Sequence, residues 1–227
     1  MPDTTGLEKP PSRRRPGRPV HSSGARVDGR LRLLEAAVEQ FGHLGYEAVS
    51  LRALADKAGL DAALVVHHFG SKQQLWRAAV DAVAARYQPQ LAVLEELLQA
   101  PGPLQQRVHD VIDFFIQHVS GHQDLFRFIQ RELGYPGPRL QYLTRTLVEP
   151  CYALCEPLWQ QAIAMKLLRS PHPAVFHFLL FGALSTTLGA APMIAQLAGQ
   201  EVDQTSIMRS LRVILQGHFP DGCADCL

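Results

Sequence analysis

The chain has 227 residues, enough for a small domain and a larger one, and 47% of them are hydrophobic, so a substantial core is expected. Its formal charge is only +1, which argues against indiscriminate binding to nucleic acid. The charge is uneven, because residues 1–87 carry a balance of +4 and residues 88–227 one of −3. A basic N-terminal part beside a mildly acidic remainder fits nucleic-acid binding at one end of the molecule.

Residues 1–28 are rich in proline, arginine, serine and glycine and lack an apolar period, which predicts a disordered basic arm. The run Arg13–Pro19 (RRRPGRP) resembles the AT-hook pattern of minor-groove binders in a permuted order. Such an arm can enter a narrow minor groove, with Arg15 and Arg18 as candidate contacts. The alternative is a solubilising tail that attracts phosphates without sequence preference. The arm contains no apolar run, so no signal peptide is expected.

Two short helices around a tight turn are predicted between Ser50 and Lys72. Ser50 can cap the first helix, and Gly59 can adopt the left-handed conformation that ends it. Asp61 can cap the second helix, where its charge suits the positive end of the helix dipole. A preceding helix with an apolar stripe completes the compact arrangement of a helix-turn-helix, whose second helix enters the DNA major groove.

The run from Leu33 to Trp76 resembles the N-terminal domain of TetR/AcrR-type transcriptional regulators. The matching features are Ala36-Ala37, Phe41, Gly45-Tyr46, Ser50, Leu54-Ala55, Ala58-Gly59, His68-Phe69 and Ser71-Lys72. The resemblance implies an all-α fold, with a three-helix DNA-binding head at residues 29–72 and a ligand-binding and dimerisation domain at residues 73–227. It also implies a homodimer that binds double-stranded operator DNA and responds to a small-molecule effector.

The candidate DNA contacts lie on the helix-turn-helix and on the arm. Arg52 can reach a guanine, although a solvated surface charge is the alternative, and the methyl groups of Ala62 and Ala63 can meet thymine methyls. Lys72 resembles the family's phosphate-contacting lysine. The aromatic residue that is frequent in the family at the position of Val66 is missing, so this helix should anchor phosphates weakly. The full set is Ser50, Arg52, Asp61, Ala62, Ala63, Val66, His67, Lys72, Arg15 and Arg18.

The larger domain is expected to consist of successive helices. They are predicted near 72–87, 89–100, 103–120, 122–134, 139–149, 150–168, 174–191 and 203–217. Pro150 and Pro157 should bend or divide a helix, and bent helices leave space for a ligand. Aromatic and histidine side chains could line such a pocket, although plain core packing is the alternative. The candidates are Phe114, Phe115, His118, Phe126, Tyr142, Trp159, His177 and Phe181. Arg131-Glu132 is expected to form an exposed or interhelix ion pair rather than a ligand clamp.

The stretch from Ser170 to Gln200 has no charged side chain. Its prolines, glycines and polar residues argue against a membrane span, so burial against a second subunit is favoured. In chains that resemble this one, the last two long helices pair across the dimer, which here implicates 174–191 and 203–217, the latter through a stripe that includes Leu211. A dimer would place two heads about 34–36 Å apart, on successive major grooves. No membrane partner and a cytoplasmic location are expected.

Cys151, Cys155, Cys223 and Cys226 are interpreted as unpaired, reduced thiols, because the terminal CxxC lacks a second such pair to complete a zinc site. No metal or cofactor is expected, and no catalytic motif indicates an enzyme. The favoured function is a repressor that a small apolar effector releases from a palindromic operator. The alternatives are the same head with redox or metal sensing through cysteines, or a helical enzyme or membrane-associated protein that does not bind DNA.

Overall fold

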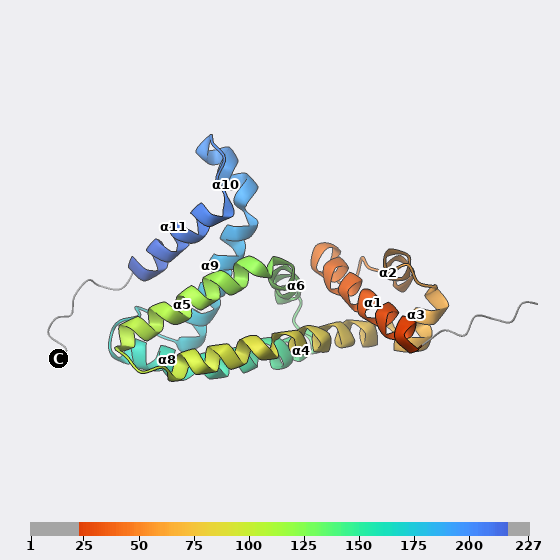
Figure 1. Ribbon diagram of the computed structural model, residues 1–227, viewed down its shortest axis with the longest axis horizontal. Helices are drawn as coiled ribbons and strands as arrows, with labels where there is room; N and C mark the ends of the chain where they lie inside the picture. The colour runs from red at the N-terminus through yellow and green to blue at the C-terminus, as the bar shows by residue number, and fades with distance from the viewer. Residues whose placement is uncertain (1–22, 218–227) are drawn as a thin grey trace, which may run out of the picture.

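The computed structural model describes residues 23–217, and within this range every regular element is a helix, so the expected all-α fold is confirmed. The elements in order are α1 (Ser23–Leu44), α2 (Leu51–Ala58), α3 (Ala62–Phe69), α4 (Lys72–Gln99), α5 (Leu104–Gly121), α6 (Gln123–Leu133), α7 (Pro138–Leu143), the π-helical turn η1 (Thr144–Val148), α8 (Glu149–Ala164), α9 (Pro173–Gly189), α10 (Ala191–Ala198) and α11 (Gln204–Gly217). The head of α1–α3 lies at one end of the molecule, and the long helix α4 runs from it along the body (Figure 1).

The two turns of the head form as their residue types dictate. The Ser50 hydroxyl accepts a hydrogen bond from the backbone N–H of Ala53 at 3.1 Å and so caps α2. Gly59, at φ 66°, ends α2 in the left-handed region. The Asp61 carboxylate accepts from the N–H of Ala63 at 2.7 Å and caps α3. The predicted helix-turn-helix is therefore present in the structure.

The predicted arm and the observed first helix overlap. Because α1 begins at Ser23, the prediction of disorder throughout residues 1–28 is wrong for its last six residues. Residues 1–22, which include Arg15 and Arg18, lie outside the described residues. The proposed minor-groove contacts of those two arginines therefore stay predictions.

The core of the head extends beyond the predicted domain boundary at residues 72 and 73. Phe128 of α6 and Leu143 of α7 are both fully buried in the same cluster as Phe41 and Trp76. The Phe128 ring centroid lies 5.9 Å from that of Trp76 and 6.5 Å from that of Phe41. Helices of the larger domain thus complete the core of the head.

α4 is one continuous helix where two were predicted, near 72–87 and 89–100. Pro89 lacks the N–H that a helix interior requires, yet it lies on the exposed side of α4, where water can satisfy the carbonyl that loses its partner. The Gln90 amide, in the orientation that satisfies its hydrogen bonds, donates to the carbonyl oxygens of Arg86 at 2.9 Å and Tyr87 at 3.3 Å. Buried Val83 and Leu94 hold the two halves against the body core.

The predicted division before Pro150 takes the form of a widened turn. The N–H of Glu149 donates to the carbonyl of Thr144, five residues earlier, so η1 is a π-helical turn between α7 and α8. Such turns recur at functional sites. Pro157 does not divide α8, which runs through it.

The uncharged stretch forms two helices, α9, which matches the predicted helix over 174–191, and α10, which was not predicted. Among the described residues, no single helix is long and apolar enough to cross a membrane, and α9 with α10 reaches that length and composition only as a pair bent by 65°. α11 packs on α5 and α9. Its residue Leu211 is 5% exposed and belongs to the chain's own core.

Candidate functional site

The outward face of α3 carries small alkyl groups and imidazoles. Val65 and Phe69 are buried and fix the helix to the head. Ala63, Val66 and His67 are exposed, with Val66 at 50%, and Ala62 is partly buried. This face can make apolar contacts and imidazole hydrogen bonds in a DNA groove.

The other predicted DNA contacts within the described residues differ in their exposure and in the hydrogen bonds that they already make. Arg52 is exposed on α2. The side chains of Ser50 and Asp61 already accept helix-capping hydrogen bonds. Lys72 is partly buried, with its ammonium 4.4 Å from the centroid of the Tyr46 ring and donating to the carbonyl of Glu47 at 3.2 Å. Lys72 therefore also braces the turn between α1 and α2.

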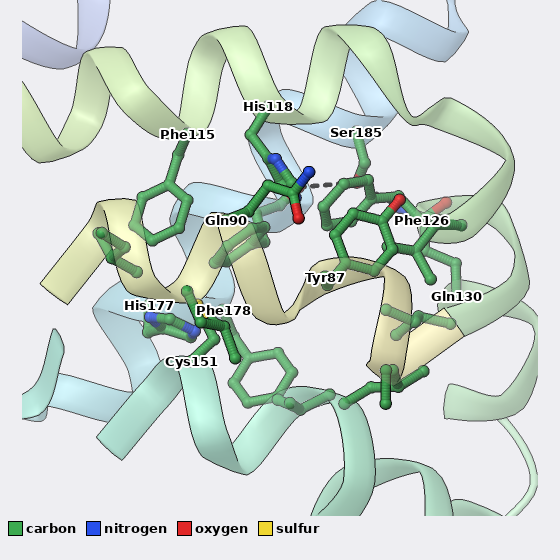
Figure 2. A pocket seen from close by; sticks show the side chains of 18 of the residues that line it. Tyr87, Gln90, Phe115, His118, Phe126, Gln130, Cys151, His177, Phe178 and Ser185 are labelled. Atoms are coloured by element: carbon green, nitrogen blue, oxygen red, sulfur yellow. Dashed lines mark hydrogen bonds between the residues drawn. The ribbon is translucent and has the colours of Figure 1, made fainter. Parts of the chain in front are cut away.

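The body contains a cavity of about 150 Å³ between α4, α5, α6, η1, α8 and α9. In Figure 2, Phe115 and His118 reach from α5 toward Tyr87 and Gln90 of α4. The lining residues are Ala84, Tyr87, Gln88, Gln90, Leu91, Leu94, Phe114, Phe115, His118, Leu125, Phe126, Ile129, Gln130, Leu133, Thr146, Leu147, Val148, Cys151, His177, Phe178, Phe181, Gly182 and Ser185.

The structure brings six of the eight predicted ligand residues together around this cavity. They are Phe114, Phe115, His118, Phe126, His177 and Phe181. Trp159 is fully buried outside the lining, where its indole N–H donates to His177 Nδ1 at 3.3 Å. Tyr142 lies beside the head, with its hydroxyl donating to Asp81 at 2.6 Å and its ring 6.2 Å from Trp76.

Sequence reasoning missed the part of the lining that comes from α4, from η1 and from polar side chains. Tyr87, Gln90 and Ser185 lie on helices whose periodicity was visible, but only the packing of six elements shows which face turns inward. Ser185 marks the polar part of the wall, since it accepts a hydrogen bond from the Gln130 amide at 2.7 Å.

Burial keeps the two histidines of the cavity uncharged at neutral pH. It lowers the pKa of His177 to about 4, and burial together with the neighbouring His122 lowers the pKa of His118 to about 4. Because the Trp159 indole donates to Nδ1 of His177, the ring proton of neutral His177 is on Nε2. Burial also raises the pKa of Tyr87 to about 12, so its hydroxyl is neutral.

α6 lies between the cavity and the head. Phe126 and Ile129 line the cavity, while Phe128 is buried in the core of the head. At the C-terminal end of α1, the carbonyl of His43 accepts a hydrogen bond from the Arg131 guanidinium at 2.9 Å. A displacement of α6 by a molecule in the cavity would therefore act directly on the head.

Comparison with known proteins finds a family match for the head of the molecule. The family model described as "Bacterial regulatory proteins, tetR family" matches residues 33–79, which cover the helix-turn-helix and the start of α4. Residues 33–79 therefore carry the DNA-binding domain of this family. The resemblance to TetR/AcrR-type regulators is thereby confirmed.

Curated relatives agree with the family. The transcriptional regulatory protein RaaS of Mycobacterium tuberculosis is 58% identical over 53 residues, which is 23% of this chain and 24% of that protein. The transcriptional dual regulator CecR of Shigella flexneri is 31% identical over 131 residues, covering 53% of this chain and 58% of that protein. The matches thus span between a quarter and three fifths of the length of these two relatives. Both are described as regulators, in agreement with the expectation that the chain is not an enzyme.

Solved structures share the fold over most of the chain. A proposed fatty acid metabolism regulator of Clostridium perfringens has a TM-score of 0.64 at 15% identity, covering 84% of this chain and 100% of that chain. The regulator FadR of Bacillus subtilis, solved in complex with stearoyl-CoA, has a TM-score of 0.59 at 15% identity, covering 83% and 98%. The body therefore has the same helical arrangement as these two regulators, at about 15% sequence identity.

The adjacent residues Arg131 and Glu132 of α6 have different partners. Glu132 is buried and pairs with Arg139, whose Nε lies 3.2 Å away, and not with Arg131. Arg139 also approaches Glu47 of the head at 3.3 Å. Glu132 therefore forms an interhelix ion pair, as expected, while Arg131 donates to the carbonyl of His43.

The cysteines that the structure describes lie one helical turn apart on α8. Cys151 lines the cavity and Cys155 is buried beneath it. A hydrogen bond with Cys151, together with burial, raises the pKa of the Cys155 thiol far above its usual range, so this thiol is a poor nucleophile. Cys223 and Cys226 lie outside the described residues. Within residues 23–217, no group of three or more metal-ligating side chains could hold a metal ion.

Proposed function

We propose that the chain is a ligand-responsive transcriptional regulator, a repressor that leaves a palindromic operator when a small apolar molecule occupies the cavity. The observation that carries this proposal is the position of α6. Its residues line the cavity on one side, and Phe128 completes the core of the DNA-binding head on the other. Two sites that share a helix can influence each other whenever the helix moves.

The coupling would run through α6 and α4. α4 begins at the head with Lys72 and contributes Tyr87, Gln90 and Leu91 to the cavity. A ligand that favours a different spacing of the two heads would lower operator affinity, and a coupling of about 1–3 kcal/mol corresponds to a change of roughly 5–150-fold. The B. subtilis structure with stearoyl-CoA shows that a protein of this fold can hold a ligand.

We place the homodimer interface on the outward faces of α9 and α11. Leu179 of α9 is 59% exposed, and Val213 of α11 is 66% exposed. Large exposed apolar side chains on packed helices are typical of surfaces that a second subunit covers. In this arrangement Leu211 supports the interface from within its own subunit and does not touch the partner.

Selection of bound duplexes from random DNA tests the proposal. We expect a pseudo-palindromic site with half-sites about 10–10.5 base pairs apart or a multiple of that spacing. A chain that selects no sequence, or whose binding does not weaken with salt, would not be a DNA-binding regulator.

Two head variants separate base reading from phosphate anchoring. Arg52→Ala should relax the preference at one position of each half-site and cost about 1–3 kcal/mol there. Lys72→Gln keeps a donor for the Glu47 carbonyl but removes the charge, so it should weaken all duplexes alike and lower the salt slope by about 1. If both variants lose affinity without regard to sequence, Arg52 is only a phosphate contact.

Cys151 in the cavity wall favours one second candidate, a response to thiol oxidation. Its neighbour Cys155 stays protonated, which counts against a reactive pair. Replacement of all four cysteines by serine decides the matter, because loss of the operator response would support the thiol mechanism. An unchanged response would eliminate it.

A further inference from the structure

We propose that the cavity accepts an uncharged molecule about the size of one aromatic ring, and that it excludes carboxylates, ammonium ions and coenzyme A thioesters. The proposal rests on the proposed function only for its biological meaning, because ligand binding can be measured without DNA. The proposal follows from the size of the cavity and from the charge and chemistry of its wall.

The charge of the wall excludes ions. None of the described residues that line the cavity is Asp, Glu, Lys or Arg. The two histidines that could supply a positive charge, His118 and His177, are neutral at physiological pH. A carboxylate or ammonium group that entered would lose its hydration and find no counter-charge, which is costly in an apolar surrounding.

The size of the cavity limits the ligand. At about 150 Å³, it has the volume of an engineered apolar cavity in another protein that holds benzene. One aromatic ring fits this volume, whereas the phosphates of a coenzyme A group would meet no basic side chain in the wall. This chain therefore differs in ligand class from the neighbour that was solved with stearoyl-CoA.

The chemistry of the wall favours a flat ring. Phe115 and Phe181 meet edge to face at 4.7 Å, and Phe126 stacks with Phe181 at 5.5 Å, so aromatic edges and faces surround the space. A ligand ring can extend this arrangement through the same offset and edge contacts. The neutral polar groups of Tyr87, Gln130 and Ser185 can serve one hydroxyl or carbonyl on the ligand.

A matched series of probes tests the charge requirement. Benzyl alcohol, benzoate and benzylammonium share one ring and differ mainly in charge at pH 7.5. We expect benzyl alcohol to bind the full chain at least about tenfold more tightly than either ion in ligand-observed NMR, since a buried ion without a partner is strongly disfavoured. Stearoyl-CoA, as a fourth probe, should bind no better than the ions.

Two glycines of α9 provide a variant and its control. A Cβ at Gly182 or at Gly189 meets nothing within 4 Å, but only Gly182 lines the cavity. Gly182→Leu should therefore fill the space and reduce benzyl alcohol binding at least tenfold, whereas Gly189→Leu should leave it unchanged. Circular dichroism and the melting temperature check that both variants fold.

The outcomes separate the ligand class from the proposed function. The inference is overturned if benzyl alcohol does not bind, if an ion or stearoyl-CoA binds equally well, or if Gly182→Leu leaves binding unchanged. Benzyl alcohol that binds in the cavity without changing the affinity for the selected duplex would support the ligand class and contradict the regulatory coupling.

Discussion

At the scale of single residues, the outward face of α3 is unusual in what it offers to DNA. Ala63 and Val66 present methyl groups, and His67 presents an imidazole, so hydrogen-bond donors are few on this helix. In the major groove, the 5-methyl group of thymine is the matching apolar partner. The preference for certain bases should then depend on contacts that carry no hydrogen bond.

Replacement of thymine by uracil within the selected half-site tests these contacts. Each methyl group that α3 covers should contribute about 0.8 kcal/mol, so its removal should weaken binding about fourfold. Val66→Ser should weaken binding to the thymine duplex and leave little difference between thymine and uracil, as fluorescence anisotropy can show. Uracil in the flanking sequence serves as the control, and equal effects at both places would contradict methyl recognition.

His177 should make the stability of the protein depend on pH. Its pKa falls from 6.5 to about 4 on burial, so the unfolded chain binds its proton more readily than the folded chain does. The associated stability is complete above pH 6.5 and is lost as the pH falls toward 4, with a total on the order of 3 kcal/mol.

Urea unfolding at several pH values measures this dependence. His177→Asn keeps an oxygen near the Trp159 N–H but does not titrate, so it should roughly halve the slope of the stability curve between pH 4 and 6.5 and leave the part that His118 contributes. A wild-type curve that is flat over this range would contradict the neutral, buried imidazole.

At the scale of elements, the interface between α6, α7 and the head depends on one buried carboxylate. Arg139 of α7 reaches Glu132 of α6 at 3.2 Å, and its guanidinium carbon lies 4.0 Å from the Tyr46 ring centroid. Glu132 is 2% exposed, so it needs this partner. The ion pair connects two body helices at the surface that the head contacts.

Arg139→Met should therefore lower the free energy of unfolding by about 3 kcal/mol, because it leaves the Glu132 charge buried and unpaired. The double variant Arg139→Met/Glu132→Leu should recover most of that loss. The exposed pair of Lys57 and Glu39, at 2.8 Å, provides the control, since Lys57→Met should cost less than about 1 kcal/mol. Additive losses in the double variant would show that the pair is not coupled.

The sequence predicted best those elements whose determinants are local. Ser50, Gly59 and Asp61 each act within a few residues, and the head forms as they indicated. The predicted division between 87 and 89 is wrong, because the effect of Pro89 on a helix depends on which side of α4 it occupies, and only the packed structure decides that. The cavity was predicted in part, since aromatic residues at helical spacing are visible in sequence while the inward face of α4 is set by the contacts of other helices.

At the scale of the whole molecule, apolar periodicity alone could not assign the dimer surface. The stripe on α11 was expected to meet a second subunit, yet Leu211 packs against its own chain, and Val213 faces outward. The buried and the outward apolar residues of α11 both recur at helical spacing, and only their packing in the folded chain distinguishes them. The expected effect of charging each residue differs accordingly.

Leu179→Glu and Val213→Glu should give folded monomers that no longer bind the palindromic duplex, because a single head keeps too few contacts. Leu211→Glu should instead destabilise the subunit, since it buries a charge in the core. Val93→Glu, at an exposed site on α4, should remain dimeric. Sedimentation at micromolar concentration measures the oligomeric state of each variant. A monomeric wild type would refute the interface.

The closure of the head's core by Phe128 and Leu143 has a consequence for protein engineering. The segment that the family shares, residues 33–79, contains neither side chain. A chimaera that grafts this segment onto the body of another regulator inherits the DNA-reading surface but keeps whatever residues that body places against Phe41 and Trp76. Exchange of DNA specificity between such proteins therefore requires that positions 128 and 143 travel with the head, although they lie some fifty residues or more beyond it in the chain.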